Sequence, residues 1–280
     1  MNVSSLQALS NNIAEIVEKS GKAIVSLNAN RRFSPSGIHW QEGIIVTSDE
    51  SLKRDDDITV TLENGDIKPV LLLGRDPSTD VAVFQIENPE IPVATIGDAA
   101  NLKVGNLVLA LARSSEGDIR HLRKRFTTSA NRTPPHPFHG REVGFKAKGS
   151  LFAGERSFTF PEMSIRAAMG TISVISGEWK SMSGGNIDKF IRPDISLYPG
   201  FSGGALVDAL GNIIGMNTTG RRGTALTIPA STINRVVEQL VSKGRIPRGY
   251  LGLVMEPVRL PVNLNITLNL NLNSFVIVVN

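Results

Sequence analysis

The chain has 280 residues, of which 41% are hydrophobic and 20% charged, and it contains 26 glycines and 15 prolines. This composition is typical of a turn-rich globular protein with room for one large domain or two small ones. The sequence contains no cysteine, which excludes disulfides, thiolate catalysis and cysteine-based zinc sites. No stretch reaches the roughly eighteen consecutive apolar residues that a membrane-spanning helix needs.

Residues 1–21 predict an amphipathic helix that Ser4 or Ser5 can cap and Gly21 can end. The apolar positions of one face are Leu6, Leu9, Ile13, Ile16 and Val17. The segment has neither a basic start nor a continuous apolar run, so it is not a secretory signal as it stands. We therefore expect a cytoplasmic protein, or a periplasmic or extracytoplasmic one if translation starts further upstream.

Residues 22–112 predict a first β-barrel and the start of a second. The β-rich runs are KAIVSLNA, EGIIVTS, DDITVTLENG, IKPVLLLGRD, DVAVFQIE and VGNLVLALAR. Turn signals such as Asn64-Gly65 and Asp76-Pro77 separate them, and no helical period intervenes. Regular spacing of this kind indicates an all-β barrel or sandwich.

Residues 113–163 predict a basic insertion in a loop. Between 119 and 163, nine Lys and Arg residues stand against three Glu residues, which gives this segment a net charge of +6 when the whole chain has +4. The run RHLRKRF can attract nucleic acid or another acidic partner, although a solvated loop explains the same charges. His136 and His139 have an H-x-x-H spacing, but no third ligand lies nearby in sequence, so we expect no metal site and no cofactor.

Residues 164–249 predict the rest of the second barrel and a closing helix. β-rich segments follow one another up to GTALTIPA, and residues 233–243 then show helical periodicity. The apolar face consists of Ile233, Val236, Val237 and Leu240, and Gly244 and Pro247 stop the helix.

The stretch YPGFSGGALVD places Ser202 in a turn of small residues before an apolar strand. Small neighbours let a tight turn present the serine Oγ to a cleft, while backbone N–H groups point at the oxygen of an acyl-transfer intermediate. Gly200 and Ser202 would supply those N–H groups. A glycine-rich hairpin with an incidental serine is the alternative for this motif taken alone.

The same stretch, together with GTALTIPAS after it and DPSTDVAVFQIE before it, resembles the trypsin-like serine proteases of the HtrA/Deg type. The resemblance covers residues 22–249 apart from the insertion. It implies a chymotrypsin-like double barrel with two six-stranded antiparallel barrels, a His/Asp/Ser triad in that order along the chain, and often a PDZ domain after it.

Carried over to this sequence, the resemblance implies that Ser202 is the nucleophile and that Asp80 is the acid that orients the histidine. It also implies that the P1 side chain of a substrate is small or medium and apolar. The residues it places around that side chain are Ser196, Leu226, Thr227 and Ile228.

The general base departs from the family pattern. The histidine is expected after a run of the form VTxxH, and here Val46 and Thr47 are followed by Glu50 at that position. A serine hydroxyl is a poor nucleophile without a base that takes its proton and passes it to the leaving amine. Two adjacent carboxylates, Glu50 and Asp80, are expected to have one raised and one lowered pKa.

Three alternatives to a complete loss of the general base are left open by the sequence. Another histidine could act, namely His39 or one of His121, His136 and His139 in the insertion, although a histidine on a barrel strand is the simpler interpretation of His39. Glu50 could serve at low pH, as in the Ser/Glu/Asp arrangement of acid-acting subtilisin-like enzymes. An error at codon 50 is the third. Phe201, where the family more often has Asn or Asp, is a second departure and removes a zymogen switch, not a catalytic group.

The last segment, 250–280, resembles the start of a PDZ domain in RGYLGLVMEPV, and its 31 residues are too few for a whole module. The run FVIVVN then predicts a strand without partners, which is an aggregation risk or an oligomer contact.

From these observations we predict a degenerate HtrA-type serine endopeptidase with a polypeptide substrate or ligand and very low or no activity at neutral pH. A pseudoprotease that binds a peptide or partner without chemistry is the alternative, and a decaying gene product is a third possibility.

Overall fold

The computed structural model describes residues 3–30, 34–113, 165–219, 224–246, 254–258 and 275–279. Contacts between Cα atoms divide the chain into two units, residues 1–245 and 246–280. The predicted basic insertion therefore lies almost entirely outside the described residues, as do His121, His136 and His139. The same holds for most of the predicted PDZ-like fragment.

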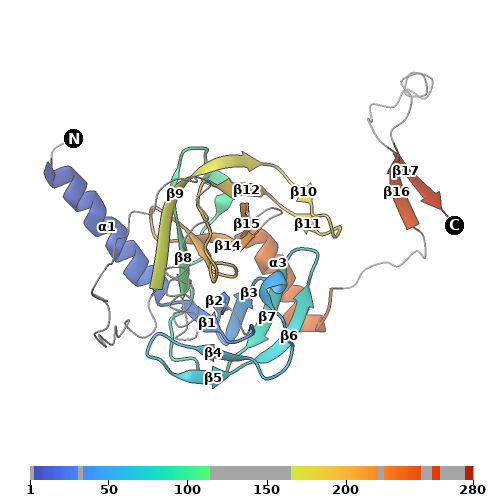
Figure 1. Cartoon of the computed structure of the whole chain (residues 1–280), viewed down its shortest axis with the longest axis horizontal. Coiled ribbons are helices and arrows are strands. Elements are labelled where there is room, and N and C mark those ends of the chain that lie inside the picture. Colours follow the sequence, from blue (N-terminus) through green and yellow to red (C-terminus); the bar gives the residue numbers. More distant parts are fainter. Residues whose placement is uncertain are drawn as a thin grey trace, which may run out of the picture. The chain divides into compact units, whose positions relative to one another are not determined.

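The first unit begins with helix α1 (Val3–Gly21) and contains two β-barrels followed by helix α3 (Ala230–Lys243) (Figure 1). The prediction of an all-β fold with short helices before and after the barrels is confirmed. Among the described residues, no helix is long and apolar enough to cross a membrane.

A seven-stranded antiparallel sheet with the order β5-β4-β1-β2-β3-β7-β6 forms the first barrel, drawn in blue and cyan in Figure 1. Its strands are β1 (Ile24–Leu27), β2 (Ser36–Gln41), β3 (Ile44–Thr47), β4 (Thr59–Thr61), β5 (Ile67–Pro69), β6 (Leu71–Asp76) and β7 (Val81–Gln85). Only Val70 separates β5 from β6, so the two ends of the sheet are the two halves of one bent segment. Six segments of chain thus form the wall of the first barrel, as predicted.

A closed barrel of six strands, in the order β12-β15-β14-β13-β8-β9, forms the second half of the unit. Its strands are β8 (Leu107–Arg113), β9 (Ile165–Ser176), β12 (Phe190–Pro193), β13 (Ala205–Asp208), β14 (Ile213–Thr219) and β15 (Ala225–Pro229). A small hairpin, β10 (Trp179–Lys180) with β11 (Asn186–Ile187), and a short 3-10 turn, η2 (Ala99–Asn101), complete it, whereas a second 3-10 turn, η1 (Asp49–Ser51), follows β3 of the first barrel.

Each barrel has its own apolar interior, as alternating strands require. Val25, Leu27, Val60 and Phe84 are fully buried in the first. In the second, Val108, Ala110 and Ala112 on β8 point inward at every other position, and small alanines leave room for larger partners such as Leu206 and Ile214 on the facing strands.

Helix α3 packs an apolar face against the barrels and ends where the sequence predicts. The buried positions of this face include Ile233, Val236, Val237 and Leu240. Gly244 has a φ of +65°, and its N–H donates to the carbonyl of Leu240 at 2.8 Å. A left-handed glycine of this kind is a common end of a helix.

The second unit, described by itself, contains one two-stranded antiparallel sheet. Strand β16 (Val254–Val258) pairs with β17 (Phe275–Val279) from Val254 opposite Val279 to Val258 opposite Phe275.

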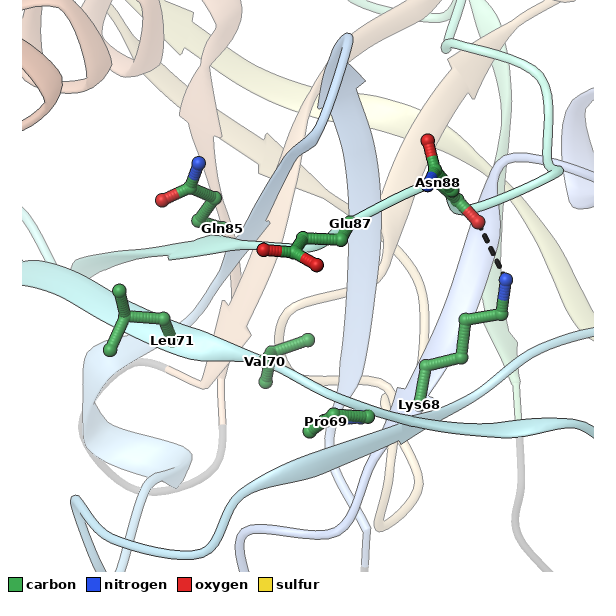
Figure 2. Close-up of a pocket in the computed structure, with 7 residues that line it drawn as sticks. All are labelled: Lys68, Pro69, Val70, Leu71, Gln85, Glu87 and Asn88. Atoms are coloured by element: carbon green, nitrogen blue, oxygen red, sulfur yellow. Dashed lines mark hydrogen bonds between the residues drawn. The ribbon is translucent and has the colours of Figure 1, made fainter.

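One hollow of about 550 Å³ lies on the first barrel, beside the bend between β5 and β6 (Figure 2). Across it the Nζ of Lys68 donates to the carbonyl of Asn88 at 2.5 Å. The residues that line it are Lys68, Pro69, Val70, Leu71, Gln85, Glu87 and Asn88. None of the predicted site residues is among them.

Candidate active site

Loops from both barrels bring the predicted catalytic residues together. Glu50 lies in η1, just after β3, and Asp80 immediately precedes β7 in the same barrel. Ser202 lies in the turn before β13 of the second barrel. The end of β14 links the two barrels at this point. Thr218 makes a hydrogen bond to Asp80, and Thr219 makes hydrogen bonds to Ser202 and to Glu50.

Asp80 is held from several sides. Its Oδ1 accepts from the backbone N–H of Glu50 at 2.7 Å, and its Oδ2 accepts from Ser48 Oγ at 2.8 Å. The Thr218 hydroxyl makes a short hydrogen bond to the same Oδ2. Asp80 itself has a left-handed φ of +59°, which is uncommon for a residue with a side chain and marks a conformation that its surroundings impose.

Glu50 faces the second barrel through its carboxylate. Its Oε1 accepts from the backbone N–H of Thr219 at 3.2 Å and lies 3.4 Å from the hydroxyl of Thr218. A hydroxyl has one proton, so Thr218 donates mainly to the closer Asp80.

Burial raises the pKa of both carboxyl groups. The pKa of Glu50 is raised first by burial and second by the charge of Asp80. The pKa of Asp80 is raised by burial, although its three hydrogen bonds act in the opposite direction. The prediction that one pKa rises and the other falls is therefore wrong, because the loss of water acts on both groups.

The hydroxyl of Ser202 makes no hydrogen bond to the carboxylate of Glu50 or Asp80 in the described part of the chain. Its Oγ lies 2.9 Å from the Oγ1 of Thr219, and this is the only hydrogen bond of that hydroxyl within the described part of the chain. The nucleophile and the residue at the base position are thus both bonded to Thr219, through different atoms of it.

The turn around Ser202 depends on glycine. Gly200 has a φ of +92° and Gly203 a φ of +80°, in the left-handed region that glycine favours. A Cβ on Gly203 would lie 2.1 Å from the carbonyl oxygen of Ser36 and 2.3 Å from Thr47 Oγ1. The small residues of the motif are therefore needed for close packing between the barrels.

Two hydrogen bonds join this turn to β14, and Ser36 joins it to the first barrel. Asn217 donates its N–H to Gly204 at 2.7 Å and accepts from the N–H of Gly203 at 2.9 Å. The hydroxyl of Ser36 donates to the carbonyl of Gly200 at 2.7 Å, and its N–H donates to the carbonyl of Ser202 at 3.0 Å. The position of the serine is thus fixed by backbone contacts on two sides.

The backbone donors predicted for an oxyanion hole have no partner among the residues that the structure describes. Neither the N–H of Gly200 nor that of Ser202 donates a hydrogen bond there. Donors of this kind, held in place before a substrate arrives, are what an acyl-transfer site needs.

The predicted substrate-binding residues differ in exposure. Ser196 is exposed and Leu226 is half-buried, whereas Thr227 and Ile228 have only 2% of their surface exposed. Thr227 donates to the side chain of Asn217 at 3.4 Å, beneath the serine turn. Leu226 and Ser196 are therefore the members of this group that a bound side chain can reach without a rearrangement.

His39 is buried and both of its ring nitrogens are engaged. Nδ1 lies 3.0 Å from the carbonyl of Pro92, and Nε2 accepts from the N–H of Gly43 at 3.3 Å. In this pattern Nε2 is an acceptor and Nδ1 faces a carbonyl oxygen. His39 therefore fixes loops around β2 and does not contact Ser202.

Sequence reasoning missed four residues that contact the site: Ser36, Arg166, Thr218 and Thr219. Two hydroxyls in succession at the end of a strand, Thr218-Thr219, were a signal that polar contacts were needed there. Arg166 gave no such signal, because it follows the long insertion. Among the described residues, no group of three or more His, Asp or Glu side chains is arranged to hold a metal ion.

Comparison with known proteins places this arrangement in a family. The model of the trypsin-like peptidase domain matches residues 35–216, more than half of the chain, and the chain belongs to that family. Within it the chain is of the HtrA type. A protein of Chlamydia pneumoniae named "Probable periplasmic serine endoprotease DegP-like" is 27% identical over 224 residues, which cover 78% of this chain and 36% of that protein.

A protein of Brucella suis with the same name is also 27% identical, over 226 residues that cover 78% of this chain and 34% of that protein. The chain thus spans about a third of the length of these curated relatives. Among solved structures, the HtrA-type protease AlgW with a tripeptide has a TM-score of 0.63 and 26% identity, over 92% of this chain and 72% of that one. A serine endoprotease from Yersinia pestis has a TM-score of 0.59 and 25% identity, over 87% and 71% of the two chains.

The predicted cytoplasmic location is contradicted, because these relatives are named periplasmic serine endoproteases. The prediction rested only on the lack of a leader in residues 1–21. Such a lack carries no information on the compartment.

Proposed function

We propose that the chain is an HtrA-type serine endopeptidase homologue that hydrolyses peptide bonds very slowly or not at all at neutral pH, because Ser202 has no general base. One observation carries the proposal. The hydrogen-bond partner of Ser202 Oγ is the hydroxyl of Thr219, and the carboxylate at the position of the base is bonded to the N–H of Thr219 instead.

The chemistry supports low activity. A threonine hydroxyl has no basic lone pair strong enough to take the serine proton at neutral pH. A serine protease that loses a triad member retains a rate enhancement of only about 10³ to 10⁴ over the uncatalysed reaction in water, which comes from the oxyanion hole and from substrate binding. Glu50 does not replace the histidine, since it makes no hydrogen bond to Ser202.

A polypeptide is the ligand that this proposal implies. HtrA-type relatives have been solved with a tripeptide and with a decapeptide, which supports the same class of ligand here. The names of the curated relatives support action in the periplasm.

A second candidate function is a pseudoprotease that binds a peptide or a partner without chemistry. It is favoured by the turn around Ser202, whose backbone donors and glycine conformations are in place while the base is absent. The decaying gene product remains the third possibility, and a chain without peptide binding and without labelling at Ser202 would support it.

The test combines a fluorophosphonate probe with a casein digestion assay, with Ser202→Ala as the control. We expect slow labelling of the wild type and no casein turnover. Rapid labelling of Ser202 with turnover would contradict the proposal. Slow labelling together with tight binding of casein peptides would favour the pseudoprotease.

A further inference from the structure

Arg166, the second residue of β9, reaches the turn that precedes Ser202. Its Nη1 donates to the carbonyl of Pro199 at 3.1 Å, and its guanidinium carbon lies 5.4 Å from the centre of the Phe201 ring. A Cβ on Gly200 would lie 2.3 Å from its Nη2. The arginine therefore contacts three successive residues just before the serine.

The geometry of this turn relates the Pro199 carbonyl to the predicted oxyanion donor. The N–H of Phe201 donates to the carbonyl of Tyr198 at 3.1 Å, which closes a four-residue turn. Proline at its second position and a φ of +92° at the third position, Gly200, define a type II turn.

The peptide between Pro199 and Gly200 is trans, so its C=O and its N–H point in opposite directions. Any group that holds the Pro199 carbonyl therefore also sets the direction of the Gly200 N–H. Arg166 is such a group, and the N–H of Gly200 points away from it.

A rotation of this peptide would convert the turn to type I and put the carbonyl where the N–H was. Both turns accept proline at the second position, and glycine accepts either sign of φ at the third. The backbone alone consequently leaves two orientations open. A charge-assisted hydrogen bond from an arginine to the carbonyl favours one of them.

We propose that Arg166 is a positioning residue that holds the Pro199–Gly200 peptide in the orientation in which the Gly200 N–H serves as an oxyanion donor. Ser36 assists it, because its hydroxyl holds the next carbonyl along the chain, that of Gly200. The inference rests on the proposed function only in taking Ser202 as the nucleophile of the site.

The test measures the affinity of a peptidyl boronic acid with an apolar P1 residue for the full chain, by calorimetry. The boron accepts a lone pair from Ser202 Oγ, the serine proton passes to the buffer, and the tetrahedral adduct places an oxygen at the oxyanion position. This equilibrium reports on the oxyanion donors without the need for turnover. Ser202→Ala gives the affinity that does not depend on the adduct.

We expect Arg166→Ala to weaken the Ser202-dependent affinity about tenfold or more, since the loss of a whole oxyanion donor costs roughly 10² to 10³ in rate. Arg166→Lys, which retains a charged donor, should recover most of that loss. Arg166→Gln, which retains an uncharged donor, should have an affinity between those of the other two variants. It replaces Arg166→Ala in the test if the alanine variant does not fold.

The matched control is Arg235→Ala. The Arg235 guanidinium donates to the carbonyl of Asn186 and to Asp188, each at 2.8 Å, and its side chain is 41% exposed. Its loss should leave the boronate affinity unchanged. An unchanged affinity in Arg166→Ala, an equal loss in Arg235→Ala, or a wild type that binds no better than Ser202→Ala would each overturn the inference.

A failure of the proposed function is distinguishable from a failure of this inference. If the wild type hydrolyses peptides rapidly, the proposal of low activity is wrong, but Arg166→Ala is then still expected to lower kcat with little change in KM. A lower kcat would support the role of Arg166 in that case. An unchanged kcat would overturn it.

Discussion

A single threonine separates the nucleophile of this site from the carboxylate that stands in place of its base. The hydroxyl of Thr219 is bonded to Ser202, and its N–H is bonded to Glu50. Restoring the histidine alone would therefore leave Ser202 bonded to a group that cannot accept its proton.

We expect Glu50→His to recover little fluorophosphonate labelling and the double variant Glu50→His, Thr219→Ala to recover at least about tenfold more, within the 10² to 10⁴ that general acid–base catalysis supplies. Labelling rates of the two variants give the comparison. Adding Thr218→Ala should remove the gain, because Thr218 holds Asp80, which must orient the new histidine. Equal rates for the single and double variants would show that Thr219 does not restrain Ser202.

The raised pKa of Glu50 also predicts how stability depends on pH. A carboxyl group whose folded pKa is raised contributes stability that is fully present below its unfolded pKa and is lost as the pH rises through the folded pKa. At pH 7, Glu50→Gln should therefore be more stable than the wild type by a few tenths of a kcal/mol; the effect is small because only part of the Glu50 side chain is buried and water screens the charge of the exposed part.

Thermal unfolding of both proteins between pH 4 and pH 7 measures this difference, which should vanish near pH 4, where the wild-type carboxyl is protonated as well. Gln retains an acceptor for the N–H of Thr219, so the comparison isolates the charge. A constant difference at all pH values would contradict the titration of Glu50.

At this scale the sequence predicted a site made of Glu50, Asp80 and Ser202, but not that Thr218 and Thr219 would provide the hydrogen bonds that link them. Each of the three residues lies near the end of a strand, and the small residues around Ser202 predict the turn. The contacts of Thr219 and Arg166 depend on the packing of strands that lie far apart in the sequence, and residue types alone do not encode that packing.

At the scale of elements, β2 and β14 hold the serine turn from opposite sides, through Ser36 and Asn217. The strands themselves were predictable from alternating apolar residues and turn signals. The bend that splits β5 from β6 was not, since Pro69 is compatible with an ordinary edge strand as well.

The close approach at Gly203 predicts a large loss of stability on substitution. Gly203→Ala adds a methyl group 2.1 Å from the carbonyl oxygen of Ser36, in addition to the cost of its φ of +80°. Gly65 has a φ of +90° but nothing within 4 Å of an added Cβ, so Gly65→Ala measures the backbone cost alone.

We expect Gly65→Ala to lower the free energy of unfolding by about 1 to 2 kcal/mol and Gly203→Ala by at least about 3 kcal/mol, measured in urea. A Gly203 variant as stable as the Gly65 variant would show that the turn can move away from β2 at little cost.

At the scale of the whole molecule, charge is distributed unevenly. Residues 119–163 carry a net charge of +6 in a chain of +4. Replacing Arg120, Arg123, Lys124 and Arg125 by Gln should lower the salt concentration at which the protein elutes from a polyanion column.

The control for that experiment replaces four exposed lysines elsewhere, Lys22, Lys103, Lys180 and Lys243, by Gln, which changes the total charge equally. We expect it to elute closer to the wild type. Equal shifts for both variants would mean that total charge alone decides and that the insertion binds no acidic partner of its own.

The single residue between β5 and β6 has a consequence for how the chain tolerates changes in length. One segment pairs with β4 on one side of Val70 and with β7 on the other, and the ladder with β7 already shifts its register once, between Leu72 and Gly74. One residue inserted at Val70 could not be absorbed in a loop. It would shift one of the ladders by one position and turn that strand's inward side chains outward, so natural variants of this chain should vary in length at the tips of its hairpins, and not at this bend.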